Sequence, residues 1–493
     1  MTHRPSSTVS PALALLLLAG LLLPSSLFPD PLAGQSPGEA ELAGAWTGEL
    51  QIPGGPSLPL IFHLEADEQN GLSATMDSPS QGVRGIAVES VRFEAGRLVL
   101  ELAALGARYE GALDADDRFT GSWYQGGMEL PLKLERTEEG VASGRPQDPT
   151  PPFPYLEEEI RYPNESAGIE LAGTLTLPEG AGPFPAVALI TGSGAQDRDQ
   201  ALVGHRPFLV LADHLTRAGI AVLRSDDRGV GESGGDFSSS TSRDFAGDAA
   251  AAVAYLRTRP EVDPGAVGLV GHSEGGMIAP MVAVEWGGVD FVVLLAGPGL
   301  PGTELLRMQG AAIARAMGAD EGQVEAAGRS QARIFEAVLE EEESRRVERV
   351  RAVLEEALAE SDPEELQAQG IPPGGEEAWV EGQVQMARSE WFRSFLMYDP
   401  RVHLSELQIP VLALFGEKDL QVPAEENRAA LAGALREAEN PDVTIRVLPS
   451  LNHLFQTAET GSPMEYAQIE ETFAPVALEA VSSWIIALTE RDP

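Results

Sequence analysis

The chain of 493 residues contains no cysteine. Disulfide bonds, thiolate metal sites and a cysteine nucleophile are therefore excluded. Lysine is almost absent as well, because Lys133 and Lys418 are the only two and nearly all of the 34 basic residues are arginine.

Positive charge is scarce compared with negative charge. The formal net charge is −42, from 76 acidic and 34 basic residues. An excess of this size disfavours nucleic acid and anionic membranes as partners. Hydrophobic residues make up 43% of the chain, which is typical of globular domains, and the length predicts two or three of them.

The first 35 residues resemble a secretory leader. The apolar run Ala12 to Leu23 is too short to span a membrane comfortably, and small residues follow it. We therefore expect a cleaved signal peptide over residues 1–35, a periplasmic or secreted enzyme, and no membrane partner after cleavage.

Residues 40–138 show short alternating segments separated by turn residues such as Asn70-Gly71. This pattern predicts a small antiparallel β-barrel or sandwich, with Trp46 and Trp123 as core residues. No catalytic group of residues occurs there. Residues 139–156 contain five prolines and are predicted to form a linker.

Strand and helix patterns alternate over residues 157–300 and 401–490, which predicts a mostly parallel sheet with helices on both faces. The last helix is expected over Ala467 to Thr489. Residues 301–400 interrupt the alternation with acidic helical sequence, including helices expected over 363–369 and 376–396. We interpret this segment as a helical cap inserted after a core strand, which would exclude water from a site.

The motif Gly271-His-Ser-Glu-Gly275 lies between an apolar strand, Ala266 to Val270, and an apolar helix that begins at Met277. G-x-S-x-G in this context is typical of a nucleophile elbow, in which a sharp turn exposes the serine hydroxyl above the sheet. Ser273 is therefore the predicted nucleophile.

A serine hydroxyl needs a base, and histidine is the side chain best suited near neutral pH. Of six histidines beyond the leader, His453 alone follows the last predicted strand, at its carboxyl end. The acid should come from the loop after strand Val411 to Phe415, which contains both Glu417 and Asp419. We expect Asp419, because it is further from the strand end and has fewer rotamers to fix.

The oxyanion of a tetrahedral intermediate needs two backbone N–H donors. The amide of Glu274 follows the nucleophile directly. The second donor is expected in the glycine-rich loop Thr191 to Asp199, from the amide of Ser193, with Gly194 as the near alternative.

These motifs together resemble the bacterial α/β-hydrolase carboxylesterases with a G-H-S-E-G-G elbow. The resemblance covers residues 157–489 and includes the stretches that begin at Thr191, Ser225 and Gly416, and Asn452-His453. It implies an α/β-hydrolase fold and ester hydrolysis through an acyl-serine, with no metal and no organic cofactor, and it gives Asp227 and Arg228 a structural role. The small β domain lies outside it.

The predicted substrate is a small-molecule ester of short to medium acyl length. A serine peptidase, a thioesterase and a non-catalytic binding protein of the same fold remain alternatives. The sequence assigns neither the natural substrate nor the oligomeric state.

Overall fold

The computed structural model describes residues 42–490, apart from 52–56, 68–70, 79–82, 95, 103–104, 115–117, 126–127, 138–144, 362–365, 367–370 and 372–373. The predicted leader lies outside the described residues. The described chain forms a β unit that ends at Pro146 and an α/β unit that starts at Gln147; Leu202–His205 group with the former. Within the described ranges, no helix has the length and apolar character needed to cross a membrane.

The β unit is a nine-stranded antiparallel sheet in the order β4-β3-β2-β1-β9-β8-β7-β6-β5. Trp46 and Trp123 are buried in its core, as predicted, and the Trp46 ring lies 4.8 Å from Phe119. One strand of this unit was not predicted, the short segment β4 with an internal glycine at the end of the sheet order. The strands are β1 (Gly44–Gln51), β2 (Ser57–Asp67), β3 (Gly71–Ser78), β4 (Val83–Val88), β5 (Ser90–Glu94), β6 (Arg97–Leu102), β7 (Ala107–Leu113), β8 (Arg118–Gln125) and β9 (Met128–Thr137).

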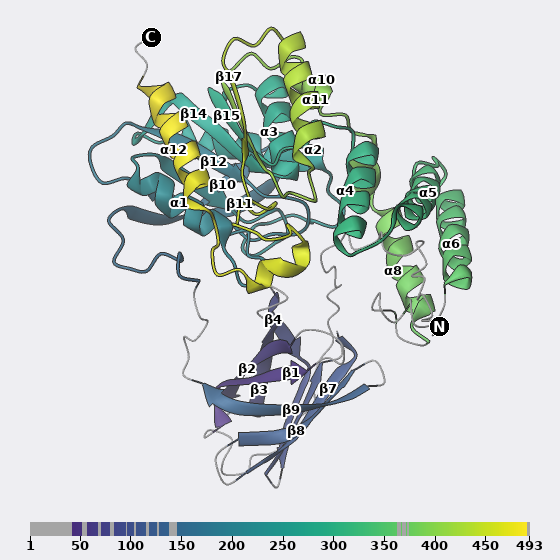
Figure 1. The fold of residues 1–493 in the computed structure, drawn as a ribbon. Coiled ribbons are helices and arrows are strands. Elements are labelled where there is room, and N and C mark those ends of the chain that lie inside the picture. Colours follow the sequence, from purple (N-terminus) through teal and green to yellow (C-terminus); the bar gives the residue numbers. More distant parts are fainter. Residues whose placement is uncertain are drawn as a thin grey trace, which may run out of the picture. The chain divides into compact units, whose positions relative to one another are not determined.

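The α/β unit has an eight-stranded sheet in the order β10-β11-β13-β12-β14-β15-β16-β17 (Figure 1). Strands β10, β11 and β13 pair antiparallel, and the remaining pairs from β13 to β17 are parallel. The strands are β10 (Leu156–Asn164), β11 (Ile169–Leu177), β12 (Phe184–Ile190), β13 (Ala221–Ser225), β14 (Val262–His272), β15 (Phe291–Leu295), β16 (Val411–Gly416) and β17 (Val443–Leu448). This mostly parallel sheet with flanking helices confirms the predicted α/β-hydrolase fold.

Strands β15 and β16 have no polar side chain because helices cover both faces of the sheet. All residues of β15 and β16 are buried. Helices α1 (Pro207–Arg217) and α12 (Pro475–Thr489) pack together. Helices α2 (Ser242–Leu256) and α3 (Glu274–Glu285) form a second packed pair, and α11 (Ala424–Glu437) follows β16. The carboxyl ends of the parallel strands then meet at one edge, where a site is expected.

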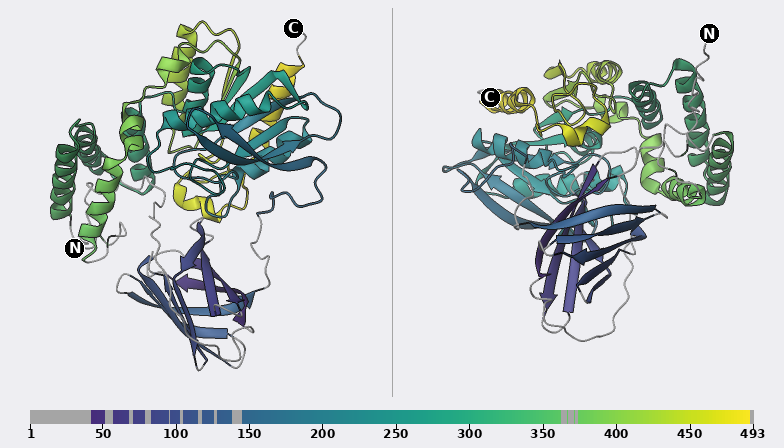
Figure 2. Two further views of the ribbon diagram at one scale, coloured as in Figure 1. Left: turned by 180° about the vertical axis from the view of Figure 1, so that it is seen from behind. Right: turned by 60° about the horizontal axis from the view of Figure 1, so that its bottom comes forward.

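A helical segment interrupts the sheet between β15 and β16, as predicted. Figure 2 shows α5, α6 and α8 beside the sheet rather than stacked on it. The segment contains α4 (Gly302–Ala316), α5 (Glu321–Val338), α6 (Glu343–Glu360), α8 (Glu376–Arg388) and α9 (Glu390–Met397), and the short helix α10 (Arg401–Leu404) follows it. Its two ends meet, because the Gly302 amide donates to the Tyr398 carbonyl at 3.2 Å.

Two predicted helices need correction. The single helix expected over 376–396 is divided at Ser389, whose hydroxyl accepts a hydrogen bond from the Phe392 amide and caps α9. The last helix begins at Pro475 rather than Ala467, since a 3₁₀ turn at Pro463–Gln468 and an extended segment precede it. The helix expected over 363–369 lies almost wholly outside the described residues.

Part of the segment predicted as a linker packs with the α/β unit. The Gln147 side chain donates to the Phe473 carbonyl at 2.7 Å and accepts hydrogen bonds from the amides of Thr472 and Phe473. Tyr155 donates to the Asp213 carboxylate at 2.9 Å. The residues from Gln147 onward therefore support the α/β fold.

Candidate active site

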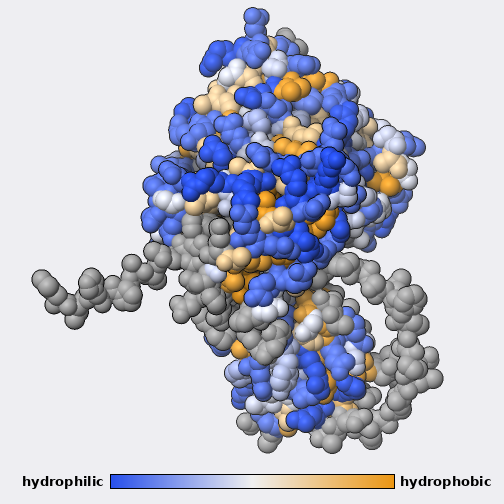
Figure 3. Space-filling model, turned by 90° about the vertical axis from the view of Figure 1, so that its right-hand side faces the viewer, coloured by the Kyte–Doolittle hydropathy of each residue, from blue (hydrophilic) through white to orange (hydrophobic). Residues whose placement is uncertain are grey.

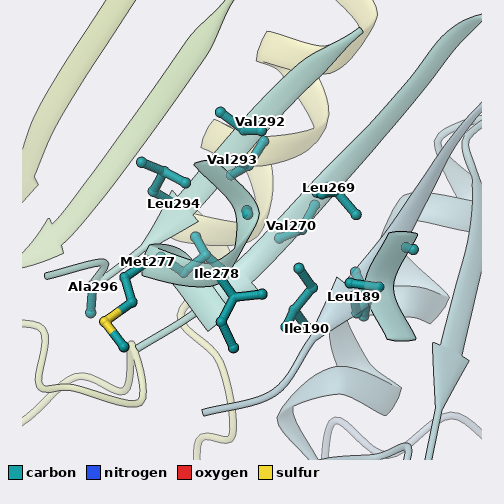
Figure 4. Close-up of a cluster of buried hydrophobic side chains, with 14 of the residues drawn as sticks. Leu189, Ile190, Leu269, Val270, Met277, Ile278, Val292, Val293, Leu294 and Ala296 are labelled. Atoms are coloured by element: carbon teal, nitrogen blue, oxygen red, sulfur yellow. The ribbon is translucent and has the colours of Figure 1, made fainter. Parts of the chain in front are cut away.

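Ser273 occupies the turn between β14 and α3 with φ 54° and ψ −118°, a left-handed conformation that a non-glycine residue adopts only under constraint. The position two residues before it must be glycine, because a Cβ on Gly271 would lie 2.0 Å from the Gly275 carbonyl oxygen. Below the turn, Met277 and Ile278 of α3 pack against the strands (Figure 4). This geometry is that of a nucleophile elbow.

The predicted base and acid are hydrogen-bonded to each other. His453 Nδ1 lies 2.8 Å from Asp419 Oδ2, and the Asp419 side chain is fully buried. The other carboxylate oxygen, Oδ1, accepts hydrogen bonds from the amides of Gln421 and Val422, both at 2.8 Å. Asp419 is therefore fixed by the backbone and orients the imidazole.

The rival carboxylate, Glu417, has a different partner. Glu417 is exposed, and its Oε2 accepts a hydrogen bond from the Ser450 amide at 2.8 Å. Of the two carboxylates on this loop, Asp419 is the one that contacts His453.

The elbow and the base loop meet through the residue before the nucleophile. His272 Nε2 lies 2.9 Å from the His453 carbonyl oxygen, and the two imidazole rings are 4.7 Å apart between centroids. The structure thus brings Ser273, which follows His272, to the loop that carries His453. The proton transfer from Ser273 to His453 stays a prediction.

The loop expected to supply the second oxyanion donor is bonded to Asp227 at two points. Its Oδ1 accepts from the Thr191 hydroxyl at 2.8 Å and its Oδ2 from the Gln196 amide at 2.9 Å. Burial raises the pKa of Asp227 to about 8. Ser193 lies inside this clamped loop, opposite the elbow, where a Cβ on Gly192 would be only 3.3 Å from Ser273 Cβ.

The Glu274 amide begins α3, directly after the nucleophile, and its carboxyl has a role that the sequence did not suggest. Glu274 Oε1 accepts hydrogen bonds from the Ser242 hydroxyl at 2.5 Å and from Trp391 Nε1 at 2.8 Å. The Ser193 side chain bonds the same carboxyl, and burial raises the pKa of Glu274. One side chain therefore ties the elbow to α2, to the oxyanion loop and to α9 of the inserted segment.

Sequence reasoning missed Trp391 and gave no role to His272. No spacing in the chain could have paired Trp391 with Glu274, because the two are joined only when the inserted segment folds back on α3. The part of the chain that the structure describes contains no group of three or more His, Asp or Glu residues arranged to hold a metal ion.

The fold and the site define this protein as a serine hydrolase of the α/β-hydrolase class. The model of the X-Pro dipeptidyl-peptidase family (S15 family) matches residues 167–436, more than half of the chain. The chain belongs to this family.

Two further comparisons name esterases. Esterase EstD of Thermotoga maritima is 29% identical over 333 residues, which cover 67% of this chain and 69% of the relative. The solved structure of Est1E from Butyrivibrio proteoclasticus with ferulic acid is 17% identical with a TM-score of 0.38, covering 67% of this chain and all of Est1E. The Pyrococcus furiosus esterase Pf2001 is 17% identical with a TM-score of 0.39, covering 60% and 83%. Both scores are low, so the fold assignment rests on the strand order of this chain.

Proposed function

We propose that the protein is a carboxylesterase that cleaves small esters through an acyl-serine intermediate. The observation that carries the proposal is the strained elbow at Ser273 beside a histidine that is bonded to a buried aspartate. Activation of a serine by a base that a third group orients is the recurring arrangement for acyl transfer.

In this mechanism, the Ser273 hydroxyl attacks the ester carbonyl carbon while His453 Nε2 accepts its proton. Asp419 stabilises the imidazolium, and the amides of Ser193 and Glu274 donate to the oxyanion. Collapse of the intermediate expels the alcohol, which takes the proton from His453. A water molecule, activated by the same histidine, then releases the acid and restores the serine.

An ester substrate is favoured over an X-Pro peptide by two observations. The curated relative EstD is an esterase. The carboxyl next to the nucleophile, that of Glu274, is buried and already accepts hydrogen bonds from Ser242 and Trp391, so it is not free to bind the ammonium group of a peptide N-terminus.

The test compares p-nitrophenyl acetate with an Xaa-Pro p-nitroanilide and an acyl thioester on the purified enzyme. Ester turnover should exceed amide and thioester turnover by at least about 100-fold and should disappear in Ser273→Ala. Faster cleavage of the Xaa-Pro amide would identify a dipeptidyl-peptidase instead.

A short to medium acyl chain is supported by the charge of the inserted segment. Glutamates on α6 and α8 are exposed and paired with arginines, as in Arg351 with Glu355 of α6 and Glu377 of α8. Figure 3 shows a largely hydrophilic face with scattered hydrophobic residues. Such a surface has little affinity for lipid, so activity should fall from butyryl to palmitoyl esters. Activation by an oil–water interface would contradict this.

Export is proposed from the leader-like residues 1–35. Mass spectrometry of the mature protein from a bacterial host should find an N-terminus between residues 26 and 38 in the extracytoplasmic fraction. A full-length chain in the cytoplasm would refute export.

A further inference from the structure

Both ring nitrogens of His272 are engaged, and their partners determine which one carries the proton. Nε2 lies 2.9 Å from the His453 carbonyl oxygen, which can only accept, so Nε2 is protonated. Burial lowers the pKa of His272 to about 3, so the ring is neutral and Nδ1 has no proton. The Gln200 amide nitrogen, 2.7 Å from Nδ1, must therefore be the donor of that hydrogen bond.

Gln200 occupies a constrained position at the centre of the site. It has φ 55°, which is rare for a residue with a side chain, and it is 3% exposed. Its Oε1 is buried and lacks a hydrogen-bond partner among the described residues. A Cβ on Gly192 would lie 3.5 Å from Gln200 Nε2 and 3.3 Å from Ser273 Cβ, so Gln200 reaches the junction of elbow and oxyanion loop. A positive φ and a buried oxygen without a hydrogen-bond partner both cost stability. Their presence at one residue indicates that the residue has a function.

We propose that Gln200 and His272 are positioning residues for the general base. The Gln200 amide holds His272 in its neutral Nε2–H form, and His272 in turn holds the main chain of His453. The side chain of His453 is oriented from one side by Asp419, and its backbone is oriented from the other by this pair. This proposal rests on the serine-hydrolase mechanism above and adds no group that touches the substrate.

The neutral form matters because His453 becomes a cation during each acyl transfer. The two imidazole rings are 4.7 Å apart, so a proton on His272 would repel the one that His453 must accept. The Gln200 N–H group occupies the position where that proton would bind. The pair therefore fixes the geometry of the base and keeps its surroundings free of a second positive charge.

The experiment uses the full-length enzyme with p-nitrophenyl acetate and measures kcat, KM and Tm. His272→Leu removes the donor to the His453 carbonyl and should lower kcat about 100-fold, the effect expected for a misplaced catalytic group, with little change in KM. His272→Gln can still donate to the carbonyl and should recover about tenfold of that loss. Gln200→Leu should lower kcat about tenfold.

The double variant Gln200→Leu/His272→Leu should be no worse than His272→Leu, because both residues act through one carbonyl. The matched control is His214→Leu. His214 is another histidine of the α/β unit whose ring nitrogen has one hydroxyl partner, Ser482 at 2.9 Å, on the helices away from the elbow. This control should lower Tm and leave kcat unchanged.

A kcat for His272→Leu within threefold of wild type, or losses that multiply in the double variant, would overturn the proposal. If His272→Leu does not fold, a wild-type kcat in Gln200→Leu overturns it equally. Labelling of Ser273 by a fluorophosphonate provides the same comparison without an ester. A wild-type enzyme that is labelled but cleaves no ester would refute the esterase proposal and leave this one testable.

Discussion

Replacement of Asp419 by asparagine is the sharpest test of the site. The amides of Gln421 and Val422 both donate to Asp419 Oδ1, so the oxygen of an asparagine would be held at that position. Its NH₂ group would then face His453 Nδ1, now 2.8 Å from Oδ2. An NH₂ group cannot accept the Nδ1 proton, so the imidazole would carry its proton on Nε2 and could not take one from Ser273.

The size of the expected loss in kcat follows from the change of tautomer at His453. A wrong tautomer in a Ser-His-Asp triad lowers kcat about 10⁴-fold, which corresponds to about 5.4 kcal/mol of transition-state stabilisation. We expect a loss of this size for Asp419→Asn. The fold should persist, because the variant is nearly isosteric and both backbone donors keep their acceptor.

Steady-state hydrolysis of p-nitrophenyl acetate measures kcat, and circular dichroism measures Tm. Glu417→Gln is the matched control, since Glu417 lies on the same loop but accepts from Ser450. Its kcat should stay within about threefold of wild type. A larger loss in Glu417→Gln than in Asp419→Asn would show that we have assigned the wrong acid.

Three further predictions concern residues that pack around the site without taking part in the reaction. Trp391→Phe, which removes a donor to Glu274, should lower kcat/KM for esters about tenfold in steady-state assays. An unchanged kcat/KM would show that this bond between the inserted segment and the elbow does not affect catalysis. The pKa of Asp227, about 8 in the fold, is raised above its ordinary value of 3.8, so the stability from its bound proton is lost as pH rises through 8. Asp227→Asn should therefore gain Tm relative to wild type as pH rises from 5 to 8 and keep a level difference above pH 8, and a difference that does not change between pH 5 and 8 would contradict this. A chain that starts at Pro146 should keep ester hydrolysis, whereas one that starts after Tyr155 should melt several degrees lower; equal melting temperatures would refute the role of residues 147–155.

The sequence is most informative for strands that are buried on both faces of the sheet and that begin and end at turn residues. The strand expected over Val411 to Phe415 is β16, which ends one residue later at Gly416, because a fully buried apolar run between turn residues has few alternative structures. The division between α8 and α9 was missed because Ser389 is compatible with a helix interior, and only its capping bond to Phe392 identifies it as a boundary.

Within the site, chain order and motif predicted Ser273, His453 and Asp419 as the catalytic residues. What could not be predicted are contacts between segments far apart in the chain, since no local pattern encodes them. Gln147 bonds the segment at Phe473, and Phe473 stacks on Phe455, two residues beyond the base. The Trp391–Glu274 and Gln200–His272 bonds are of the same kind.

The junction at Gly302 and Tyr398 has a consequence for how such enzymes diversify. Because the inserted segment leaves and rejoins the sheet at one hydrogen bond, its length and helices can change without displacing β15 or β16. A segment from another hydrolase could be grafted at this junction to alter substrate choice while the triad remains intact. The Trp391–Glu274 bond limits that freedom, since a graft without an N–H donor at this point would leave a buried carboxyl beside the nucleophile short of a partner.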